Sequence, residues 1–419
     1  MRKPERIVHL GLGAFFRAHQ AWYTQHAKDA ADWGIVAYTG RGPKAAQELN
    51  AQDCRYTLVT RSESGDEFEV IDSVVRAQAA DDVEDLKTTL AKPEIALVTL
   101  TITEAGYQVS EQALESSALG RLALGLDARR LANGEPIALV PCDNMPANGE
   151  VLKAALLKLS TSIGAELTRY LQDSVSFVST SIDRITPKTQ PEDIELVLNQ
   201  TGFSDQAVVV TEPFRDWILQ GDFPLGRPAW ESAGAKFVED IEQFENRKLW
   251  LLNGAHTLMS FVGRILGHET VDQAIQDPAV LELVNAFWDE AQNHLTHEAL
   301  EVPSYRAALI ERFTNPRIGY RLEQIAQEGI TKLGVRIAPV ALLELKAGRL
   351  PKGAISAISG FVCWVLSNQE VSDSREAEIH AAIESSDPVA ALISLVDKEL
   401  LNFPVLVGQI REKVLEITV

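Results

Sequence analysis

The chain has 419 residues, of which 46% are hydrophobic and 23% charged, and this size and balance are typical of an enzyme with two folded domains. Its formal net charge of −20 argues against binding to nucleic acid or to an anionic membrane, because both need a basic face. Three scattered cysteines and the lack of an apolar run of membrane-span length indicate a soluble protein of a reducing compartment, and we expect a cytoplasmic location.

The first half of the chain alternates short apolar strands with helices. Strands are predicted at residues 6–10, 34–39, 96–101, 137–141 and 174–179, and helices at 14–29, 43–52, 81–91, 110–132 and 149–172. Extra strands, which could pair antiparallel, are predicted at residues 56–61 and 67–77, with another at 208–211. The alternation indicates a parallel, doubly wound sheet that binds its ligand at the carboxyl ends of the strands.

The second half is predicted to be almost wholly helical. Its expected helices are 240–266, 271–276, 278–299, 304–313, 319–328, 336–348, 351–368, 374–385 and 388–400. The fold class is therefore an α/β Rossmann-type parallel sheet domain followed by a mostly α-helical domain. We place the dinucleotide-binding domain at residues 1–240 and the helical substrate and catalytic domain at residues 241–419.

A glycine turn follows the first strand and precedes the first helix. Gly11 permits a tight turn there, and Gly13 lets the backbone approach a pyrophosphate at the start of the helix. Phe16 stands where the motif's third glycine would be, so the match is incomplete. Arg17 could reach a phosphate, or it could be a solvated residue of the first helical turn. The context predicts a nicotinamide dinucleotide cofactor.

The end of the second strand bears on the choice between NAD and NADP. An acid that would bind the adenosine ribose of NAD is missing from residues 39–44. Arg41 with Lys44 could instead accept a 2′-phosphate, whereas Arg41 stacked on the adenine would suit either cofactor. NAD is expected, and NADP is not excluded.

Polar groups also follow the later strands. Thr103 and Glu104 would lie near the nicotinamide ribose, although Thr103 could simply cap a helix. Asn144 can present a carboxamide to the reacting oxygen. Asp183 could bind a substrate hydroxyl, or it could serve a structural role with Arg184.

An amine, a carboxamide and an imidazole lie close together in an apolar segment. On one continuous helix over residues 245–265, His256 lies about 80° and Asn253 about 140° round from Lys248. Burial favours a neutral lysine, which can take a proton from a secondary alcohol, while Asn253 donates to the alkoxide and His256 holds the hydroxyl. The alternative is a surface pair of Lys248 with Glu245 or Glu242, and a histidine satisfied in the core.

A metal site is not predicted. His294 and His297 have the i, i+3 spacing of metal ligands on a helix, but the sequence offers no evident third ligand. Two solvated histidines are the expected interpretation of that pair.

Several long motifs occur together in a fixed order. They are residues 7–20 (IVHLGLGAFFRAHQ), 100–107 (LTITEAGY), 142–149 (CDNMPANG), 179–187 (STSIDRITP), 211–214, 226–230 (GRPAW), 248–256 and 312–316 (RFTNP). Over residues 6–345 the chain resembles the mannitol dehydrogenase family of polyol-specific long-chain dehydrogenases. That family includes mannitol 2-dehydrogenases, arabinitol dehydrogenases, fructuronate reductases and tagaturonate reductases.

The resemblance implies a role for each matching residue. Lys248 corresponds to the general base, and Asn144 and Asn253 to the carboxamides that hold the alkoxide oxygen. His256 and Asp183 correspond to substrate-positioning residues, and Glu245 to a carboxylate that helps move the released proton. The implied cofactor contacts are Gly11, Gly13, Phe15 and Arg17. No metal is implied.

Residues 328–336 depart from the family pattern, which usually has Asp-Gly-Ser and a proline after the lysine. Lys332 and Arg336 are the expected substrate contacts in this segment. The partner is a small-molecule polyol, ketose or sugar acid, and a monomer is expected rather than an oligomer.

The leading hypothesis is reversible oxidation of an acyclic polyol to a ketose, such as mannitol to fructose. A rival within the class is reduction of fructuronate to mannonate, in which Lys332 or Arg336 would bind the substrate carboxylate. A non-catalytic dinucleotide sensor would need neither the lysine nor the carboxamides. A methyltransferase built on the glycine turn would not need a helical second domain.

Overall fold

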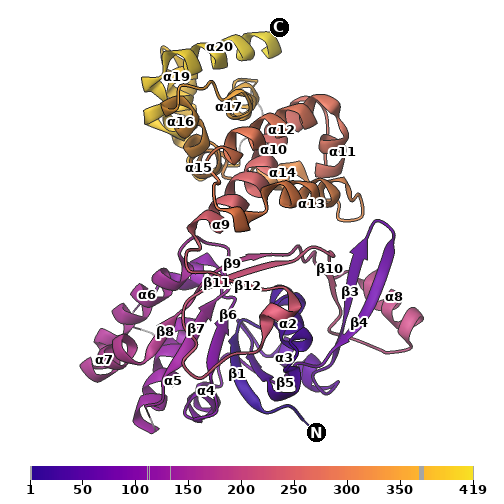
Figure 1. Ribbon diagram of the computed structural model, residues 1–419, viewed down its shortest axis with the longest axis vertical. Coiled ribbons are helices and arrows are strands. Elements are labelled where there is room, and N and C mark those ends of the chain that lie inside the picture. The colour runs from indigo at the N-terminus through magenta and orange to yellow at the C-terminus, as the bar shows by residue number, and fades with distance from the viewer. Residues whose placement is uncertain (1, 111, 113, 133, 368–371, 419) are drawn as a thin grey trace. The chain divides into compact units, whose positions relative to one another are not determined.

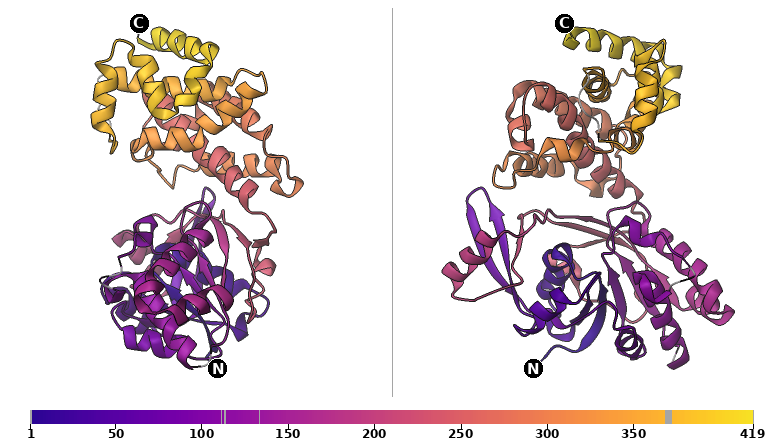
Figure 2. Two further views of the ribbon diagram at one scale, coloured as in Figure 1. Left: turned by 90° about the vertical axis from the view of Figure 1, so that its left-hand side faces the viewer. Right: turned by 180° about the vertical axis from the view of Figure 1, so that it is seen from behind.

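The computed structural model describes residues 2–110, 112, 114–132, 134–367 and 372–418, without the side chains of the last two. The chain divides into two compact units, Met1–Glu242 and Gln243–Val419 (Figure 1). Figure 2 shows the sheet of the first unit and the helices of the second from two further sides. Within the described part, no helix combines the length and the apolar character needed to cross a membrane.

The first unit is built on a six-stranded sheet in which all neighbours pair parallel, in the order β5-β2-β1-β6-β7-β8. The strands are β1 (Glu5–Leu10), β2 (Gly34–Tyr38), β5 (Val74–Gln78), β6 (Leu97–Leu100), β7 (Ile137–Pro141) and β8 (Val175–Phe177). Numbered along the chain within this sheet, the order is 3-2-1-4-5-6, which is that of the Rossmann fold. Strands β1, β2 and β5 are added in one direction across the sheet and β6, β7 and β8 in the other, so the strand order reverses between β1 and β6, where ligands bind in such sheets.

Both faces of the sheet are covered, because successive strand residues point to opposite sides. Val8 and Val36 belong to the core under α4 to α7, whereas Ile7 and Ile35 face the core under α1 to α3 (Figure 1). The helices are α1 (Ala14–Ala18), α2 (Gln20–His26), α3 (Lys44–Asn50), α4 (Val83–Leu90), α5 (Ala118–Ala132), α6 (Asn148–Ile163) and α7 (Ala165–Asp173), with 3-10 turns at Ala30–Asp32, Glu104–Tyr107 and Leu114–Ser116. The predicted fold class of this domain is confirmed.

Two small sheets complete the first unit. One has the order β10-β3-β4, with β3 (Tyr56–Ser62) antiparallel to β4 (Gly65–Ile71) and parallel to β10 (Val209–Thr211). The other has the order β12-β11-β9, with β9 (Ser179–Asp183), β11 (Asp216–Gln220) and β12 (Lys236–Phe237). Helix α8 (Pro191–Thr201) and a 3-10 turn at Trp230–Ala233 lie in the same region.

Several predicted boundaries in this unit were wrong. The single strand expected at 67–77 is two strands, of which β4 turns back along β3 and β5 joins the main sheet beside β2. The helix expected at 14–29 is interrupted at His19, and that at 149–172 at Gly164, whose φ is +155°. Residues 111 and 113 of the helix expected at 110–132 lie outside the described residues.

The second unit is helical. It contains α9 (Glu242–Arg247), the π-helix η5 (Lys248–Gly254), α10 (Ala255–Ile265), α11 (Val271–Gln276), α12 (Pro278–Gln292), η6 (Glu298–Leu300), α13 (Val302–Thr314), α14 (Leu322–Ala326), α15 (Gly329–Arg336), α16 (Ala338–Lys346), α17 (Lys352–Leu366), α18 (Glu376–Ile383), α19 (Pro388–Val396), η7 (Lys398–Asn402) and α20 (Pro404–Thr418). α15 and α20 were not predicted as helices.

α17 is buried on all sides, and a Cβ at Gly353 would lie 2.3 Å from the Phe287 nitrogen, so α17 and α12 pack backbone to backbone.

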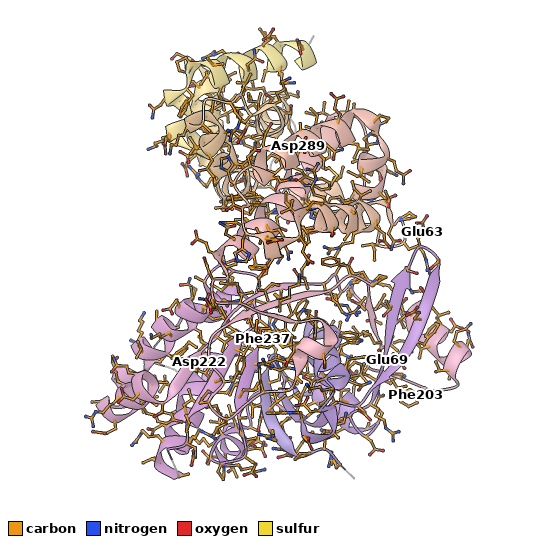
Figure 3. All side chains as sticks on the ribbon, in the orientation of Figure 1. Glu63, Glu69, Phe203, Asp222, Phe237 and Asp289 are labelled. Carbon is orange, nitrogen blue, oxygen red and sulfur yellow. The ribbon has the colours of Figure 1, made fainter. Side chains whose placement is uncertain are left out.

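A buried carboxyl group joins these two helices. Glu290 of α12 accepts hydrogen bonds from the backbone nitrogens of Gly353 (2.6 Å) and Ala354 (3.0 Å) at the start of α17. Its side chain therefore satisfies donors that have no partner within the helix. Burial, and then the nearby carboxylates of Glu344 and Asp289, raises the pKa of Glu290 to about 7 (Asp289 is labelled in Figure 3).

Replacing Glu290 with glutamine should remove a pH-dependent loss of stability. Its pKa is raised from 4.5 to about 7 in the folded chain, so its contribution to stability is complete below the unfolded value and is lost as the pH rises through about 7. Between about pH 4 and about pH 8, the free energy of unfolding of the native protein should therefore fall by roughly 3 kcal/mol more than that of the Glu290→Gln variant. Urea titrations across this range measure the difference. The matched variant Glu282→Gln, at an exposed position of the same helix, should keep the native slope.

Candidate active site

The glycine turn lies at the carboxyl end of β1. Gly11 has φ +109°, and its nitrogen and that of Leu12 both donate to the Tyr38 oxygen of β2 at 2.9 Å. A Cβ at Gly11 would lie 2.0 Å from the Thr101 carbonyl oxygen, so only glycine fits here. At Gly13 a Cβ would meet only the Gly11 oxygen at 3.6 Å, which leaves the space above that backbone open.

A buried histidine that the sequence did not single out ties this turn to β6. The Thr101 hydroxyl donates to the Gly11 oxygen (2.8 Å), so at 3.1 Å it must accept from Nε2 of His9. Nδ1 of His9 then accepts from the Thr99 hydroxyl at 2.8 Å. Burial lowers the pKa of His9 to about 3, so the ring is neutral, and it stacks on Phe16 at 3.5 Å.

Arg17 is held by the protein backbone. Its Nε donates to the Gly13 oxygen (3.2 Å) and its Nη1 to the Ala207 oxygen (2.5 Å), and burial lowers the pKa of its guanidinium. The interpretation of Arg17 as a solvated residue is therefore wrong, while its contact with a phosphate stays a prediction. Phe15, half-buried, stacks on His19 with ring centres 5.0 Å apart.

A pocket of about 440 Å³ opens beyond the ends of β1 and β2. It is lined by Leu12, Thr39, Gly40, Arg41, Gly42, Pro43, Lys44, Ala45 and Glu48. Arg41 and Lys44 are exposed, and Glu48, which supplies the carboxylate of this lining, lies 3.5 Å from the Lys44 amine. The end of β2 therefore presents cations where an NAD-specific site would place an acid.

The loop after β6 is strained and is held by a buried carboxylate. Thr103 has φ +65° and ψ 159°, a region essentially restricted to glycine that costs about 1–3 kcal/mol. Asp143 accepts from the nitrogens of Ile102 (3.2 Å) and Thr103 (2.7 Å) and from the Tyr107 hydroxyl (2.7 Å). Thr103 makes no side-chain cap to the turn that begins at Glu104, so the capping interpretation is wrong.

Asp143 is thus a positioning residue that sequence reasoning missed, although it belongs to one of the motifs. Burial raises the pKa of its carboxyl group, and its hydrogen bonds to backbone and tyrosine oppose that effect. Asn144 follows it directly and is exposed. Strain stored beside a parallel-sheet edge is typical of a functional site.

Asp183 lies elsewhere than predicted. It ends β9, opposite Asp216 of β11, rather than following the last strand of the main sheet, and it is 8% exposed. The guanidinium of Arg184 donates to the backbone oxygens of Glu212 and Ala18. Arg184 therefore ties β9 to the segment before β11 and to the end of α1.

The Lys248 segment is not the continuous α-helix that we predicted. The structure has α9 ending at Arg247, a π-helix over Lys248–Gly254, and α10 from Ala255. A π-helix hydrogen-bonds residue i to residue i+5, so residues five apart lie roughly above one another. Lys248 and Asn253 therefore share a face, and the angle of about 140° expected from α-helical spacing is wrong. Both side chains are half-buried, and His256 in the next turn is buried.

Neighbouring helices satisfy the irregular backbone of η5. Trp288 donates from Nε1 to the Leu251 oxygen (2.7 Å), and the Thr257 hydroxyl donates to the Asn253 oxygen (3.0 Å). A Cβ at Gly254 would lie 2.4 Å from the Phe287 ring, so glycine allows this close packing. π-helical turns are rare and occur frequently at functional sites.

The unpredicted helix α15 brings two cations to this segment. Nη1 of Arg336 donates to the Thr257 hydroxyl (3.1 Å) and weakly to the Asn253 oxygen (3.4 Å). One turn earlier, Lys332 donates to the Ile325 oxygen (2.9 Å). His256 packs against the rings of Phe313 (4.8 Å) and Tyr320 (5.4 Å). Asn253, His256 and Arg336 are thus brought together.

Three other polar residues considered in the sequence analysis also lie in this unit. Glu245 is half-buried on α9, one turn before Lys248. His294 is not a solvated residue as expected, because its Nε2 lies 2.7 Å from buried Glu344, and His297 caps the Ala299 nitrogen. Among the residues that the structure describes, no group of three or more His, Cys, Asp or Glu side chains could hold a metal ion.

Comparison with known proteins gives a direct assignment. Residues 5–232 match the model of the mannitol dehydrogenase Rossmann domain, and residues 240–418 match that of the mannitol dehydrogenase C-terminal domain. The chain belongs to the mannitol dehydrogenase family. The resemblance inferred from the motifs is confirmed, and this mannitol dehydrogenase family member is an oxidoreductase of the dehydrogenase type.

Three relatives align with nearly the whole of this chain. The D-mannonate oxidoreductase of Escherichia coli (strain K12) is 31% identical and aligns over 94% of this chain and 88% of its own length. The ternary complex of Pseudomonas fluorescens mannitol 2-dehydrogenase with NAD and D-mannitol has a TM-score of 0.80 at 28% identity, covering 98% of this chain and 91% of that one. A substrate-free D-sorbitol dehydrogenase has a TM-score of 0.89 at 28% identity, covering 99% and 95%.

Proposed function

We propose that this family member catalyses reversible, metal-free hydride transfer between a nicotinamide dinucleotide and a secondary alcohol of an acyclic polyol, with Lys248 as the general base. The observation that supports the proposal is the π-helix, because Lys248 and Asn253 have the five-residue spacing that shares a face of such a helix, and buried His256 lies in the next turn. The solved complex of the Pseudomonas fluorescens relative with NAD and D-mannitol supports the reaction class.

A dinucleotide fits the first unit on two observations. The turn at Gly11 and Gly13 leaves backbone accessible at the carboxyl end of β1, and a 440 Å³ pocket with cationic side chains adjoins it. Gly11, Gly13, Phe15 and Arg17 would hold the pyrophosphate side, Arg41 the adenosine side, and Thr103 with Glu104 the nicotinamide ribose. Bound there, the nicotinamide would accept the hydride. We assign dinucleotide binding to residues 1–240 and catalysis to residues 241–419.

The remaining candidate residues transfer the proton, stabilise the alkoxide or bind the substrate. Lys248 takes the hydroxyl proton as the carbinol becomes a ketone, and Glu245, one turn earlier, helps to pass that proton on. The carboxamides of Asn144 and Asn253 donate to the oxygen on which negative charge develops. His256 and Asp183 hold substrate hydroxyls, and Lys332 and Arg336 contact the far part of the substrate.

The proposal is tested by following reduced nicotinamide absorbance with mannitol, arabinitol, sorbitol, fructose, fructuronate and tagaturonate, each with both coenzymes. We expect turnover with at least one alcohol–ketone pair, and expect it to survive dialysis against a chelator. Failure of every pair would reject dehydrogenase activity and leave the dinucleotide sensor, whereas loss of turnover on chelation would reject the metal-free mechanism. Reduction of fructuronate is the second candidate, and the D-mannonate oxidoreductase relative favours it.

The cations at the end of β2 should decide coenzyme use. Arg41 and Lys44 are exposed in the pocket, so either can meet a 2′-phosphate. The variants Arg41→Ala and Lys44→Ala are expected to raise the KM for NADP by about 10- to 100-fold, because charge-assisted hydrogen bonds are worth about 1.5–3 kcal/mol, with a much smaller effect on NAD. Arg55→Ala, an exposed arginine outside the pocket, is the matched control. Equal effects on both coenzymes would contradict the assignment.

A further inference from the structure

Asn148 is a completely buried asparagine to which the proposed function assigns no role. It is the first residue of α6. Its Nδ2 donates to the backbone oxygen of Asp143 (3.1 Å) and to the backbone oxygen (2.8 Å) and hydroxyl (3.2 Å) of Thr180, and its Oδ1 accepts from the Thr180 nitrogen (2.8 Å). One side chain therefore joins the loop after β7 to strand β9.

These hydrogen bonds fix the orientation of the Asn148 carboxamide. Turned over, it would place its NH2 group against the Thr180 N–H and its oxygen against two carbonyl oxygens, so each attraction would become a repulsion. β9 is an edge strand of its small sheet, and Asn148 pairs with the backbone N–H and C=O of Thr180 as a neighbouring strand would. Leaving a buried backbone group unpaired costs about 1–3 kcal/mol, so a carboxamide is the side chain that suits this position.

The segments that Asn148 joins are closely packed. A Cβ at Gly149, the next residue of α6, would lie 2.9 Å from the backbone nitrogen and 2.7 Å from the hydroxyl of Ser179 in β9. The Thr180 hydroxyl donates to the oxygen of Pro141, the last residue of β7, at 2.6 Å. The end of β7, the start of α6 and strand β9 therefore form one frame of directly bonded segments.

This frame holds the loop that carries Asn144. The loop spans residues 142–147, between β7 and α6. The oxygen that Asn148 binds at Asp143 belongs to the peptide group that leads into Asn144. Because a peptide group is planar, holding its oxygen fixes the orientation of the whole group and the direction in which the chain enters Asn144. At the other end of the loop, Ala147 has a left-handed conformation (φ 49°, ψ 37°), which non-glycine residues adopt uncommonly.

We propose that Asn148 is a positioning residue that holds Asn144 in place to donate to the developing alkoxide. The inference rests on the proposed function, which assigns the Asn144 carboxamide to that oxygen. Asn144 itself is exposed, so the support for its backbone comes from the buried side of the loop. A donor stabilises a transition state only if it is already in place, and a displacement of about 1 Å can lower the rate by about 100-fold.

Replacing Asn148 with alanine is therefore expected to lower kcat by about 10- to 100-fold at saturating coenzyme. The dissociation constant of the coenzyme should change by less than about threefold, because Asn148 lies outside the glycine turn and the pocket at the end of β2. Steady-state kinetics and fluorescence titration measure the two quantities.

Asn50→Ala is the matched control. The Asn50 carboxamide also pairs with the backbone of a strand residue, since it donates to the Ala77 oxygen (2.7 Å) and accepts from the Ala77 nitrogen (3.3 Å) of β5. Its loss should lower the midpoint of thermal unfolding, as the loss of Asn148 does, and should leave kcat at the native value.

A double-variant cycle separates positioning from general damage to the fold. In the Asn144→Leu background, Asn148→Ala should lower kcat by less than about threefold further, because the donor that Asn148 positions is already absent. Asn148→Ser, whose hydroxyl supplies one donor from a shorter side chain, should show a smaller loss in the native background and none in the Asn144→Leu background. The serine variant carries the test if the alanine variant does not fold.

The outcomes distinguish this inference from the proposed function. Native kcat in the Asn148 variants, or a loss by the same factor with and without the Asn144 carboxamide, overturns the positioning role and leaves the proposed function standing. Native kcat in Asn144→Leu alone overturns the role assigned to Asn144 and this inference with it. Absence of turnover by the native enzyme with every alcohol–ketone pair overturns the proposed function itself.

Discussion

Replacing Lys248 with alanine is expected to lower kcat by about 100- to 10,000-fold, the range that a positioned general base contributes. The amine is half-buried at the start of the π-helix, on the face that also carries Asn253. Without it the hydroxyl proton has no acceptor as hydride leaves, so the loss should appear in kcat rather than in coenzyme binding. Steady-state kinetics and fluorescence titration of the coenzyme measure the two quantities separately.

Two controls make this result specific to a base. Lys352→Ala removes an exposed amine at the start of α17 and should leave kcat unchanged. Small primary amines added to the Lys248→Ala enzyme should restore part of its activity, and restoration should increase with the concentration of unprotonated amine. A Lys248→Ala enzyme that turns over at the native rate would show that another group takes the proton.

The sheet of the first unit could be predicted because local pattern and tertiary structure agree. Its apolar runs are bounded by turn residues, and each alternates between the two cores, as Ile7 and Val8 do. The break between β4 and β5 was not predicted, because it is marked only by Asp72-Ser73, which are turn-forming residues, and not by a glycine or proline. It arises because Val74–Gln78 pairs with β2, while the residues before it pair with β3.

The candidate site was predictable where residue type alone signals chemistry. A lysine, an asparagine and a histidine in an apolar segment, and a glycine turn after a strand, are such signals. The π-helix is not one, because distant residues stabilise it. Its Leu251 oxygen is satisfied by Trp288, and its Gly254 accommodates Phe287.

The role of Asp143 and the presence of helix α15 also depend on distant partners, so neither could be predicted from the sequence. Asp143 accepts hydrogen bonds from backbone nitrogens about 40 residues earlier, in a loop whose strained backbone has no signal in the sequence. α15 contains two glycines, which lower helix propensity, and it starts from Glu328 in a left-handed conformation (φ +54°). Asp373 accepts from the Ile330 nitrogen (3.0 Å) and so provides the cap from another segment. Because α15 was not predicted, the orientation of the Arg336 side chain on this helix could not be predicted either.

Replacing Asn253 with leucine, which has nearly the shape of asparagine but no polar atoms, should lower kcat by about 100- to 1,000-fold, the cost of removing one donor from a developing oxyanion. The variant separates chemistry from scaffold, because the backbone oxygen of residue 253 still accepts from Thr257 and Arg336 and the π-helix is kept. Circular dichroism and the midpoint of thermal unfolding check the scaffold, and steady-state kinetics give kcat.

Asn144→Leu should show a loss of the same size, because the same role is assigned to its carboxamide. If the two carboxamides act as one unit in the transition state, the double variant loses less than the product of the two single losses, because the second substitution removes a donor from a site that the first has already disabled. Losses that multiply would mean that the two asparagines contribute independently, and cooperative action of the two carboxamides would have to be abandoned. The cycle therefore tests whether the two carboxamides act cooperatively during turnover.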